Sequence, residues 1–485
     1  MNYIELLRLV APEAIVVLTA LVVLTIGLAR SGAAGFATLA ASLGLVAAAV
    51  AVLGLPAEAT RFGGMLVITP LTSLFKFICL TLAFGAVLLA RGDSRSFRNQ
   101  SEYLALLLFA TVGLMLLVGS EELLMIFIGL ELTGLSLYVL AGFNKSDARS
   151  AEAGLKYFLF GSTASAFTLF GLSLVYGMCG TTGLAGIAEK IADKAAAPLL
   201  AVGLVMTLIG FAFKIAAAPF HLWAPDTYQG APISSAAFIA SGSKVASFVV
   251  LGKIVLLGFA PVQGSAAWHA FVPGWAPLLA ALAALSIVIG NLAALAQTNV
   301  RRLLAYSAVA HAGYTLLGLI AGGRVGFSAT LFYTTVYAFT LVGAFGVIGC
   351  VRRAMGGDDF RHFAGLAGRS PVLAGSMAVF LLSLAGLPPL AGFFGKFYLF
   401  SVAFGAGENH GLLWLVALAL LGSLVSLYYY LMVLKAIFLA EAPAAGPALD
   451  PGSLQNCVLV ILAAAVLCLG LLPGILLDRI LIALP

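Results

Sequence analysis

Charged residues are scarce in this chain: Asp, Glu, Lys and Arg make up 9% of the 485 residues, whereas hydrophobic residues make up 62%. This composition excludes an ordinary soluble domain and indicates an integral membrane protein. The formal charge of +6 comes from basic residues dispersed among short loops, so no nucleic-acid partner is expected. The lipid bilayer is the first partner that the sequence predicts.

Cysteine pairs and nucleotide-binding motifs are also missing. The five cysteines have no C-x-x-C spacing, which argues against a disulfide framework and a metal cluster. No G-x-G-x-x-G after a strand, P-loop or H-E-x-x-H occurs in the sequence. We therefore expect no metal and no cofactor to be bound by this chain itself.

Long apolar runs fill most of the sequence. They predict an all-α integral membrane protein with about fourteen transmembrane helices, because runs of roughly 17–25 residues match a bilayer-spanning helix and exceed a barrel strand. The expected spans are 12–30, 35–55, 67–90, 102–119, 121–141, 154–178, 198–217, 232–258, 275–297, 303–321, 327–350, 371–404, 411–439 and 456–478.

Basic residues favour one side of these spans. The odd-numbered loops carry Arg30, Arg91, Arg95, Arg98, Lys145, Arg149, Arg301, Arg302, Arg352, Arg353, Arg361 and Arg369. The even-numbered loops carry only Arg61, Lys190, Lys194 and Arg324. By the positive-inside rule, the odd loops face the cytoplasm, and an even number of spans then places both termini on the opposite side.

Two spans contain helix breakers. The seventh is closed by Pro219, Pro225 and Pro232, and the twelfth is interrupted by Gly386, Pro388, Pro389 and Gly392. In lipid, carbonyls freed by proline need a partner, so broken helices tend to line polar cavities. The breaks lie five spans apart, which favours two inverted five-helix repeats, spans four to eight and nine to thirteen. Two ordinary proline kinks are the alternative.

The repeats also predict a division into four parts. These are an N-terminal three-helix segment at 1–100, a first repeat at 101–258, a second repeat at 259–440 and a C-terminal helix at 441–485.

Four ionisable residues lie deep inside apolar runs: Glu131, Lys214, Lys244 and Lys396. Each charge at this depth costs at least about 2.5 kcal/mol on insertion scales, and rows of such groups usually carry protons or ions. Lys214 precedes the first break by one turn and Lys396 follows the second by two turns. The alternative for Lys214 and Glu131 is a purely structural pair in which the lysine neutralises the carboxylate.

Other polar residues allow two interpretations. Lys156, near the start of its span, is a proton site or an interfacial anchor, and His311 is a proton relay or a satisfied core histidine. For the remaining residues the structural interpretation is favoured: Lys253 snorkels to the interface, His221 and Asp226 belong to a loop, and Glu121 and Glu122 cap a helix or contact another subunit.

Three segments carry a family resemblance: "FKIAAAPFHLWAPDTYQGAP", "RRLLAYSAVAHAGY" and "GLPPLAGFFGKFYLF". They resemble signature stretches of the antiporter-like membrane subunits of respiratory complex I, over about spans four to thirteen. The resemblance implies fourteen core helices, inverted repeats with broken helices seven and twelve, and a central axis of charged residues that conducts protons. By motif, the axis positions are Glu131, Lys156, Lys214, Lys244 and Lys396.

The resemblance also implies a function: a proton-translocating membrane subunit of a bacterial inner-membrane NADH-quinone oxidoreductase. Its partners would be other membrane subunits, including neighbouring antiporter-like ones, with NADH, FMN, iron-sulfur clusters and quinone bound elsewhere in the complex. It implies an ion pair between Lys214 and Glu131 as well. The 485 residues and the lysine after the double proline match the family member that lacks a long lateral helix. A subunit of a cation/proton antiporter or membrane-bound hydrogenase complex, or a structural scaffold, remains the alternative.

Overall fold

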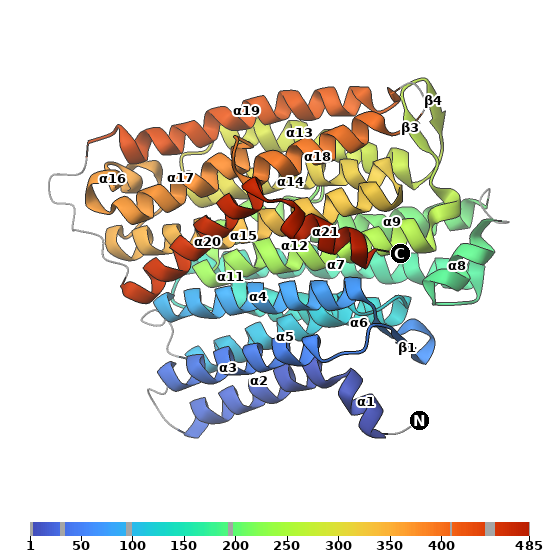
Figure 1. Cartoon of the computed structure of the whole chain (residues 1–485), viewed down its shortest axis with the longest axis horizontal. Helices are drawn as coiled ribbons and strands as arrows, with labels where there is room; N and C mark the ends of the chain where they lie inside the picture. The colour runs from blue at the N-terminus through green and yellow to red at the C-terminus, as the bar shows by residue number, and fades with distance from the viewer. Residues whose placement is uncertain are drawn as a thin grey trace.

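The computed structural model describes residues 3–29, 34–93, 99–192, 197–407, 410–441 and 452–484. Four basic residues used to predict the orientation, Arg30, Arg95, Arg98 and Lys194, lie outside the described residues. Long helices run side by side along the longest axis of the molecule (Figure 1). The predicted all-α membrane fold is confirmed.

The N-terminal half contains α1 (Tyr3–Leu9), α2 (Ala11–Ala29), α3 (Ala34–Leu53), β1 (Ala59–Arg61), η1 (Phe62–Gly64), β2 (Leu66–Ile68), α4 (Pro70–Asp93), α5 (Gln100–Val118), α6 (Leu123–Ala141), α7 (Ala148–Cys179), α8 (Leu184–Ile191), α9 (Pro198–Lys214), α10 (Trp223–Gly230), α11 (Ile233–Phe238), η3 (Ile239–Ser243), α12 (Lys244–Lys253), η4 (Ile254–Gly258) and η5 (Ala260–Val262). The segments η3 and η4 are π-helical.

The C-terminal half contains β3 (Ser265–Ala267), β4 (Ala270–Val272), α13 (Trp275–Leu295), α14 (Val300–Ala321), α15 (Gly323–Met355), η6 (Phe360–Phe363), α16 (Leu366–Arg369), α17 (Pro371–Ala385), α18 (Ala391–Gly405), α19 (Leu413–Phe438), α20 (Ser453–Leu471) and α21 (Gly474–Ala483). Two antiparallel hairpins pair β1 with β2 and β3 with β4. Strands of three residues carry too little pattern to be predicted from sequence.

Twelve helices within the described residues are long and apolar enough to cross a membrane. The interrupted segments α9–α10 and α17–α18 would bring the crossings to the predicted fourteen, because each is split into two helices too short for that count. The number of crossings, the inverted relation of the repeats and the four-part division remain predictions.

The core of the bundle lies around α14 and α15. In the most apolar 18-residue stretch of each of these two helices 94% is buried, whereas in the corresponding stretch of α20 only 11% is buried. These helices are apolar on all faces, because each face meets either lipid or a neighbouring helix and both are apolar. Polar side chains on α14 and α15 are therefore held away from lipid.

Two details of the predicted spans are wrong. The last span is not continuous, because α20 ends at Leu471 and α21 begins after Pro473, which lacks a backbone donor. Gly392 is not part of the second break but lies in the first turn of α18. A Cβ there would approach the Ser383 carbonyl oxygen to 1.8 Å, so glycine lets α18 pack against the end of α17.

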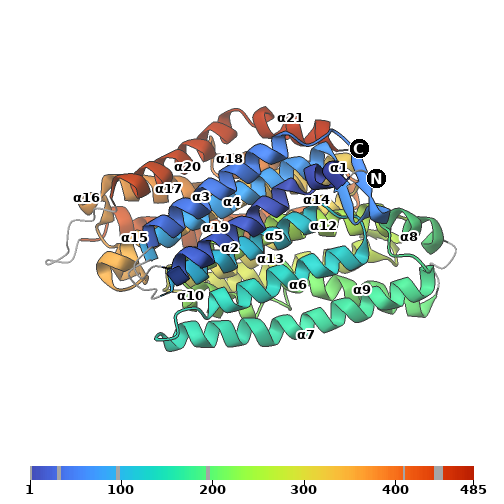
Figure 2. The same ribbon diagram turned by 90° about the horizontal axis from the view of Figure 1, so that it is seen from below.

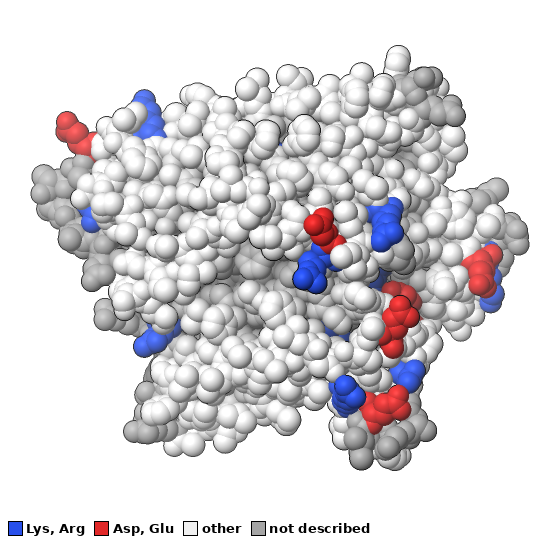
Figure 3. All heavy atoms as spheres, in the orientation of Figure 1, with Lys and Arg blue, Asp and Glu red and all other residues white. Residues whose placement is uncertain are grey.

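The loops meet at two opposite ends of the bundle. The end on the right of Figure 1 carries α8, the hairpins and both chain termini, and Figure 2 again places the termini beside α8. Backbone hydrogen bonds join loops there, from Val67 to Gly119 and from Leu123 to Thr182. On the face drawn in Figure 3, charged atoms gather toward the two ends and over α21, and the surface between is almost entirely uncharged.

Candidate functional site

Lys214 is the last residue of α9 and is buried against α6. Its Nζ lies 3.5 Å from the Leu130 carbonyl oxygen and 5.6 Å from the centre of the Tyr138 ring. A Cβ at Gly134 would lie 2.9 Å from this Nζ, so glycine makes room for the ammonium group. Beyond α9, the backbone N–H of Ala218 donates to Ser286 Oγ of α13 at 2.8 Å, which satisfies a donor that the break leaves free.

Glu131 lies on α6, half-buried, and its carboxylate turns toward α7. Ser165 Oγ donates a hydrogen bond to Glu131 Oε1 at 2.5 Å. Among the described residues no ion pair joins Glu131 to Lys214, so the pairing that the resemblance implied is wrong for this structure. The reason is geometric: the carboxylate bonds to α7, whereas the lysine approaches α6 beside Gly134.

Lys244 begins α12 directly after the π-helical segment η3. π-Helical turns interrupt the regular ladder and are frequent at functional sites. Lys244 Nζ donates to the carbonyl oxygen of Ala308 on α14 at 2.7 Å and lies 5.5 Å from the centre of the Tyr337 ring. The side chain is 2% exposed, so a protein carbonyl and a ring face stand in for water.

His311 occupies the middle of α14 and is bonded at both ring nitrogens. Nδ1 lies 2.5 Å from the Tyr333 hydroxyl and Nε2 lies 3.0 Å from the Tyr430 hydroxyl. The ring centre is 5.0 Å from that of Tyr337 and 5.5 Å from that of Tyr314. His311 is therefore a satisfied core histidine that also stands between two buried lysines.

Lys396 lies on α18, on the far side of the second break. Its Nζ donates to the carbonyl of Ala385, the last residue of α17, at 3.0 Å, and to Ser423 Oγ at 2.9 Å. A cation at a helix C-terminus is stabilised by the carbonyls that end the helix. The Nζ also lies 5.2 Å from the centre of the Tyr314 ring.

These contacts form one continuous row, which we call the lysine row: Lys244, Tyr337, His311, Tyr314 and Lys396. Each tyrosine touches the histidine on one side and a lysine on the other. All five side chains are buried. Such a row can pass a proton between groups that both accept and donate it, with water between them.

Comparisons with known proteins identify the family of this chain. Residues 120–424 match a family model described as "NADH:quinone oxidoreductase/Mrp antiporter, TM". The chain belongs to this family. It is 47% identical to "NADH-quinone oxidoreductase subunit N 2" of Acidobacterium capsulatum, over 98% of both chains. Subunit N is the family member that the 485 residues and the lysine after the double proline indicated, so that prediction is confirmed.

Two solved structures share the fold of this chain. A chain of "Respiratory complex I from Thermus thermophilus with bound Aureothin" is 34% identical, with a TM-score of 0.80 over 96% of this chain and 98% of that one. A chain of the Mrp complex from Dietzia sp. DQ12-45-1b has a TM-score of 0.85 at 22% identity, over 100% of this chain and 97% of that one. At that identity the second likeness shows the fold alone.

Lys156 lies apart from the lysine row. Its Nζ pairs with Glu152 at 2.5 Å and with Asp226 at 2.6 Å, and its side chain is 38% exposed. Asp226 also pairs with Arg302 at 2.6 Å. Asp226 is not a loop residue as predicted, because it lies in the first turn of α10. This arrangement favours the interfacial interpretation of Lys156.

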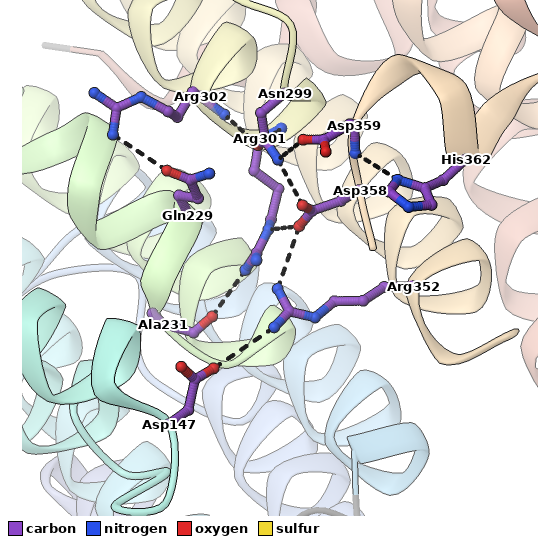
Figure 4. A network of polar contacts seen from close by, with 10 residues as sticks. All are labelled: Asp147, Gln229, Ala231, Asn299, Arg301, Arg302, Arg352, Asp358, Asp359 and His362. Atoms are coloured by element: carbon purple, nitrogen blue, oxygen red, sulfur yellow. Dashed lines mark hydrogen bonds and ion pairs between the residues drawn. The ribbon is translucent and has the colours of Figure 1, made fainter. Parts of the chain in front are cut away.

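A polar network that the sequence did not predict joins the loops at the end opposite the termini (Figure 4). Arg301, 1% exposed, bonds to the carboxylate of Asp358 and donates to the carbonyl of Ala231 at 3.0 Å. Arg352 reaches from α15 to Asp358 at 3.2 Å and to Asp147 at 3.7 Å. Residues of four odd-numbered loops (Asp147, Ala231, Arg301 and Asp358) therefore meet at one end, as the predicted alternation requires.

Two expectations for helix ends had different outcomes. Glu122 does cap α6, because its carboxylate accepts from the backbone N–H groups of Leu124 and Met125 at 3.1 and 2.8 Å. Lys253 does not snorkel: its side chain is 1% exposed, and its Nζ donates to the Val118 carbonyl at 3.0 Å. In the part of the chain that the structure describes, no group of three or more His, Cys, Asp or Glu side chains could hold a metal ion.

Proposed function

We propose that this chain translocates protons as a membrane subunit of an NADH-quinone oxidoreductase, through the lysine row together with Lys214 and Glu131. Membership of the family and the subunit N relatives support the assignment to that complex. The observation that carries the residue roles is the uninterrupted chain of buried contacts from Lys244 through His311 to Lys396.

Lysine suits this role because its ammonium can release a proton when it is desolvated, which an arginine does not do. A proton on Lys244 Nζ would pass by way of water and the Tyr337 and His311 groups to Lys396 Nζ. The buried hydroxyl of Tyr337 has no hydrogen-bond partner among the described residues, and buried hydroxyls of this kind normally bind water, so we expect water beside it. The transfer leaves Lys244 as a neutral amine, makes His311 cationic in passing, and requires Lys396 to have released its own proton beforehand so that its amine can accept the new one.

Glu131 and Lys214 form the input side of the proposed pathway. In the structure the Glu131 carboxylate accepts from Ser165, while Lys214 Nζ lies 3.5 Å from the Leu130 carbonyl oxygen and forms no ion pair with Glu131. If movement brought the two groups to about 4 Å, their attraction would be on the order of 4 kcal/mol at an effective dielectric constant of about 20. Such a movement would hold the proton on Lys214, and its reversal would release it. Quinone reduction in the partner subunits would be coupled to proton transfer by changing the distance between Glu131 and Lys214.

The hydroxyls of Thr227 and Tyr228 on α10 and of Tyr138 on α6 are further candidates for water-mediated steps. All three are buried and have no hydrogen-bond partner among the described residues. They come from the segments around Lys214, and Tyr138 packs directly against this lysine. Water at these groups would extend the pathway from Lys214 toward Lys244.

The rest of the assembly would supply the redox chemistry. The structural likeness to a chain of respiratory complex I supports assembly with other membrane subunits, including neighbouring antiporter-like ones. NADH oxidation, with its FMN and iron-sulfur clusters, and quinone reduction would occur in those partners. In a bacterial inner membrane, the arginine-rich end shown in Figure 4 would face the cytoplasm and both termini the periplasm.

Lys244→Met tests the proposal in the purified complex reconstituted into vesicles. We expect the variant to assemble and to lose most NADH-driven proton uptake, measured with a pH-sensitive dye, because methionine keeps the packing and removes the proton site. Lys190→Met, at an exposed lysine of α8, is the matched control and should pump normally. Normal proton uptake by an assembled Lys244→Met complex would contradict the proposal.

A further inference from the structure

A second set of buried charges lies outside the lysine row. Lys76 Nζ on α4 pairs with Glu13 Oε1 on α2 at 2.7 Å, and these side chains are 1% and 10% exposed. Neither residue was singled out in the sequence, because Glu13 stands at a helix start and Lys76 in a long apolar run. A buried ion pair adds little net stability, since desolvation offsets the attraction. Its presence among apolar helices therefore calls for another explanation.

A second ion pair adjoins the first. Lys253 Nζ lies 3.3 Å from Glu121 Oε1 and 3.0 Å from the carbonyl oxygen of Val118, where α5 ends. A Cβ at the next residue, Gly119, would lie 3.1 Å from Lys76 Nζ. Both lysines thus approach the same helix end. We call Glu13, Lys76, Glu121 and Lys253 the end cluster.

The side chains of the end cluster make fewer hydrogen bonds than their donors and acceptors allow. A carboxylate has about four acceptor positions and an ammonium group three donors. Beyond their ion pair, both oxygens of Glu13 and the Nζ of Lys76 have no hydrogen-bond partner among the described residues. Buried groups of this kind normally bind water. The cluster is therefore suited to hold water among four titratable side chains.

The cluster also reaches the surface. The side chain of Glu121 is 33% exposed, whereas that of its partner Lys253 is 1% exposed. The helices α2 and α4 begin and α5 ends here, at the end of the bundle that carries the chain termini (Figures 1 and 2). A proton bound to Lys253 thus lies one carboxylate away from solvent.

One helix connects the cluster to the lysine row. The first residue of α12 is Lys244 and the last is Lys253, and each adjoins a π-helical segment, η3 or η4. Nine residues of helix separate the two Cα atoms by about 14 Å. The buried hydroxyl of Ser247 lies between them along α12. A short chain of hydrogen-bonded waters spans such a distance.

We propose that the end cluster is a proton-exchange site through which the interior of the bundle communicates with water at the end that carries the termini. This inference rests on the proposed function and adds the place where protons enter or leave. In the outward direction, Lys253 Nζ gives a proton to the Glu121 carboxylate, which becomes a neutral acid and then releases the proton to water. The neutral Lys253 amine takes up the next proton from the interior. A proton that moves from Lys76 Nζ to the Glu13 carboxylate leaves a neutral amine and a neutral acid, so this step does not change the net charge of the cluster.

The test uses paired substitutions in the full complex. Single changes at Glu13 or Lys76 would leave a buried charge without its partner and weaken assembly, whatever the role of the pair. Glu13→Gln/Lys76→Met removes both charges while it keeps similar side-chain shapes. We expect an assembled complex that loses most of its NADH-driven proton uptake. The exposed pair at the same end, Glu5 and Arg61, supplies the matched control Glu5→Gln/Arg61→Gln, which should pump normally.

Glu121→Gln provides a second, milder variant, because the Glu121 side chain is 33% exposed and Lys253 Nζ keeps its hydrogen bond to the Val118 carbonyl oxygen; uptake is compared at equal complex content. We expect slower proton uptake from Glu121→Gln than from the control pair. Wild-type uptake by Glu121→Gln, or by an assembled Glu13→Gln/Lys76→Met complex, would overturn the inference. Lys244→Met separates the two proposals: if it loses uptake while the end-cluster variants do not, only the end cluster is excluded. If it pumps normally, the proposed function itself fails.

Discussion

The two helix breaks hold their lysines differently. Lys396 donates to a carbonyl and a hydroxyl at 3.0 and 2.9 Å, whereas the only hydrogen bond recorded for Lys214 within the described residues is 3.5 Å long. The Tyr314 hydroxyl beside Lys396 accepts a hydrogen bond from Asn291, whereas the Tyr138 hydroxyl beside Lys214 has no hydrogen-bond partner among the described residues. The second break is thus a preorganised site, and the first has room to change. Movement that drives transport should therefore begin at the first break.

The largest effect is expected at the preorganised site. Lys396→Met removes the charge that ends the lysine row but keeps an unbranched side chain, so the helices should pack and the complex should assemble. NADH-driven proton uptake in vesicles should fall to a small fraction of wild type. A Lys396→Met complex that pumps normally would remove this residue from the pathway and with it the contrast between the two breaks.

Lys214→Arg should have the next largest effect. Arginine keeps the positive charge but does not release its proton at reachable pH. If Lys214 exchanges a proton, Lys214→Arg lowers both quinone reduction and coupled proton uptake, even though electrostatic attraction to Glu131 survives. Turnover measured with a short-chain quinone, at unchanged complex content, checks this. Wild-type turnover would show that the lysine acts only as a fixed charge.

Glu131→Gln should impair proton uptake less than Lys214→Arg, because glutamine still accepts the hydrogen bond from Ser165 and only the charge is lost. Glu131→Asp should be milder again, since its carboxylate survives. The comparison is made at equal complex content by the initial rate of proton uptake. If Glu131→Gln equals wild type, Glu131 takes no part in controlling Lys214, and the first break would need another source of coupling.

The smallest effect is expected from Lys156→Met. The lysine is partly exposed and pairs with Glu152 and Asp226, and exposed pairs contribute little. Asp226 keeps Arg302 as a partner in the variant. Proton uptake should stay close to wild type. A loss as large as that of Lys396→Met would instead place Lys156 on the proton pathway, as the family resemblance implied.

The sequence predicted the helices better than their contacts. The expected span 232–258 differs by one residue from the helical stretch that begins at Ile233, because hydrophobicity alone decides which residues enter lipid. Hydrophobicity could not show which residue a buried charged side chain contacts. Lys253 lies near a helix end, yet it bonds to the end of α5 instead of reaching water, and Arg301 finds Asp358 in a distant loop. Such partners depend on how helices pack in three dimensions.

The sharing of Asp226 has a mechanical consequence. One carboxylate on α10 binds Lys156 of α7 and Arg302 of α14, so it fastens a half-helix to helices on both sides of it. These partly exposed pairs add little energy on their own, but the buried Arg301, which bonds to Asp358 and to the Ala231 carbonyl directly after α10, makes this end of the bundle rigid. Because this end of the bundle moves little, bending would concentrate in the non-helical residues between the end of α9 at Lys214 and the start of α10 at Trp223. That hinge lies next to the lysine whose surroundings are the least fixed.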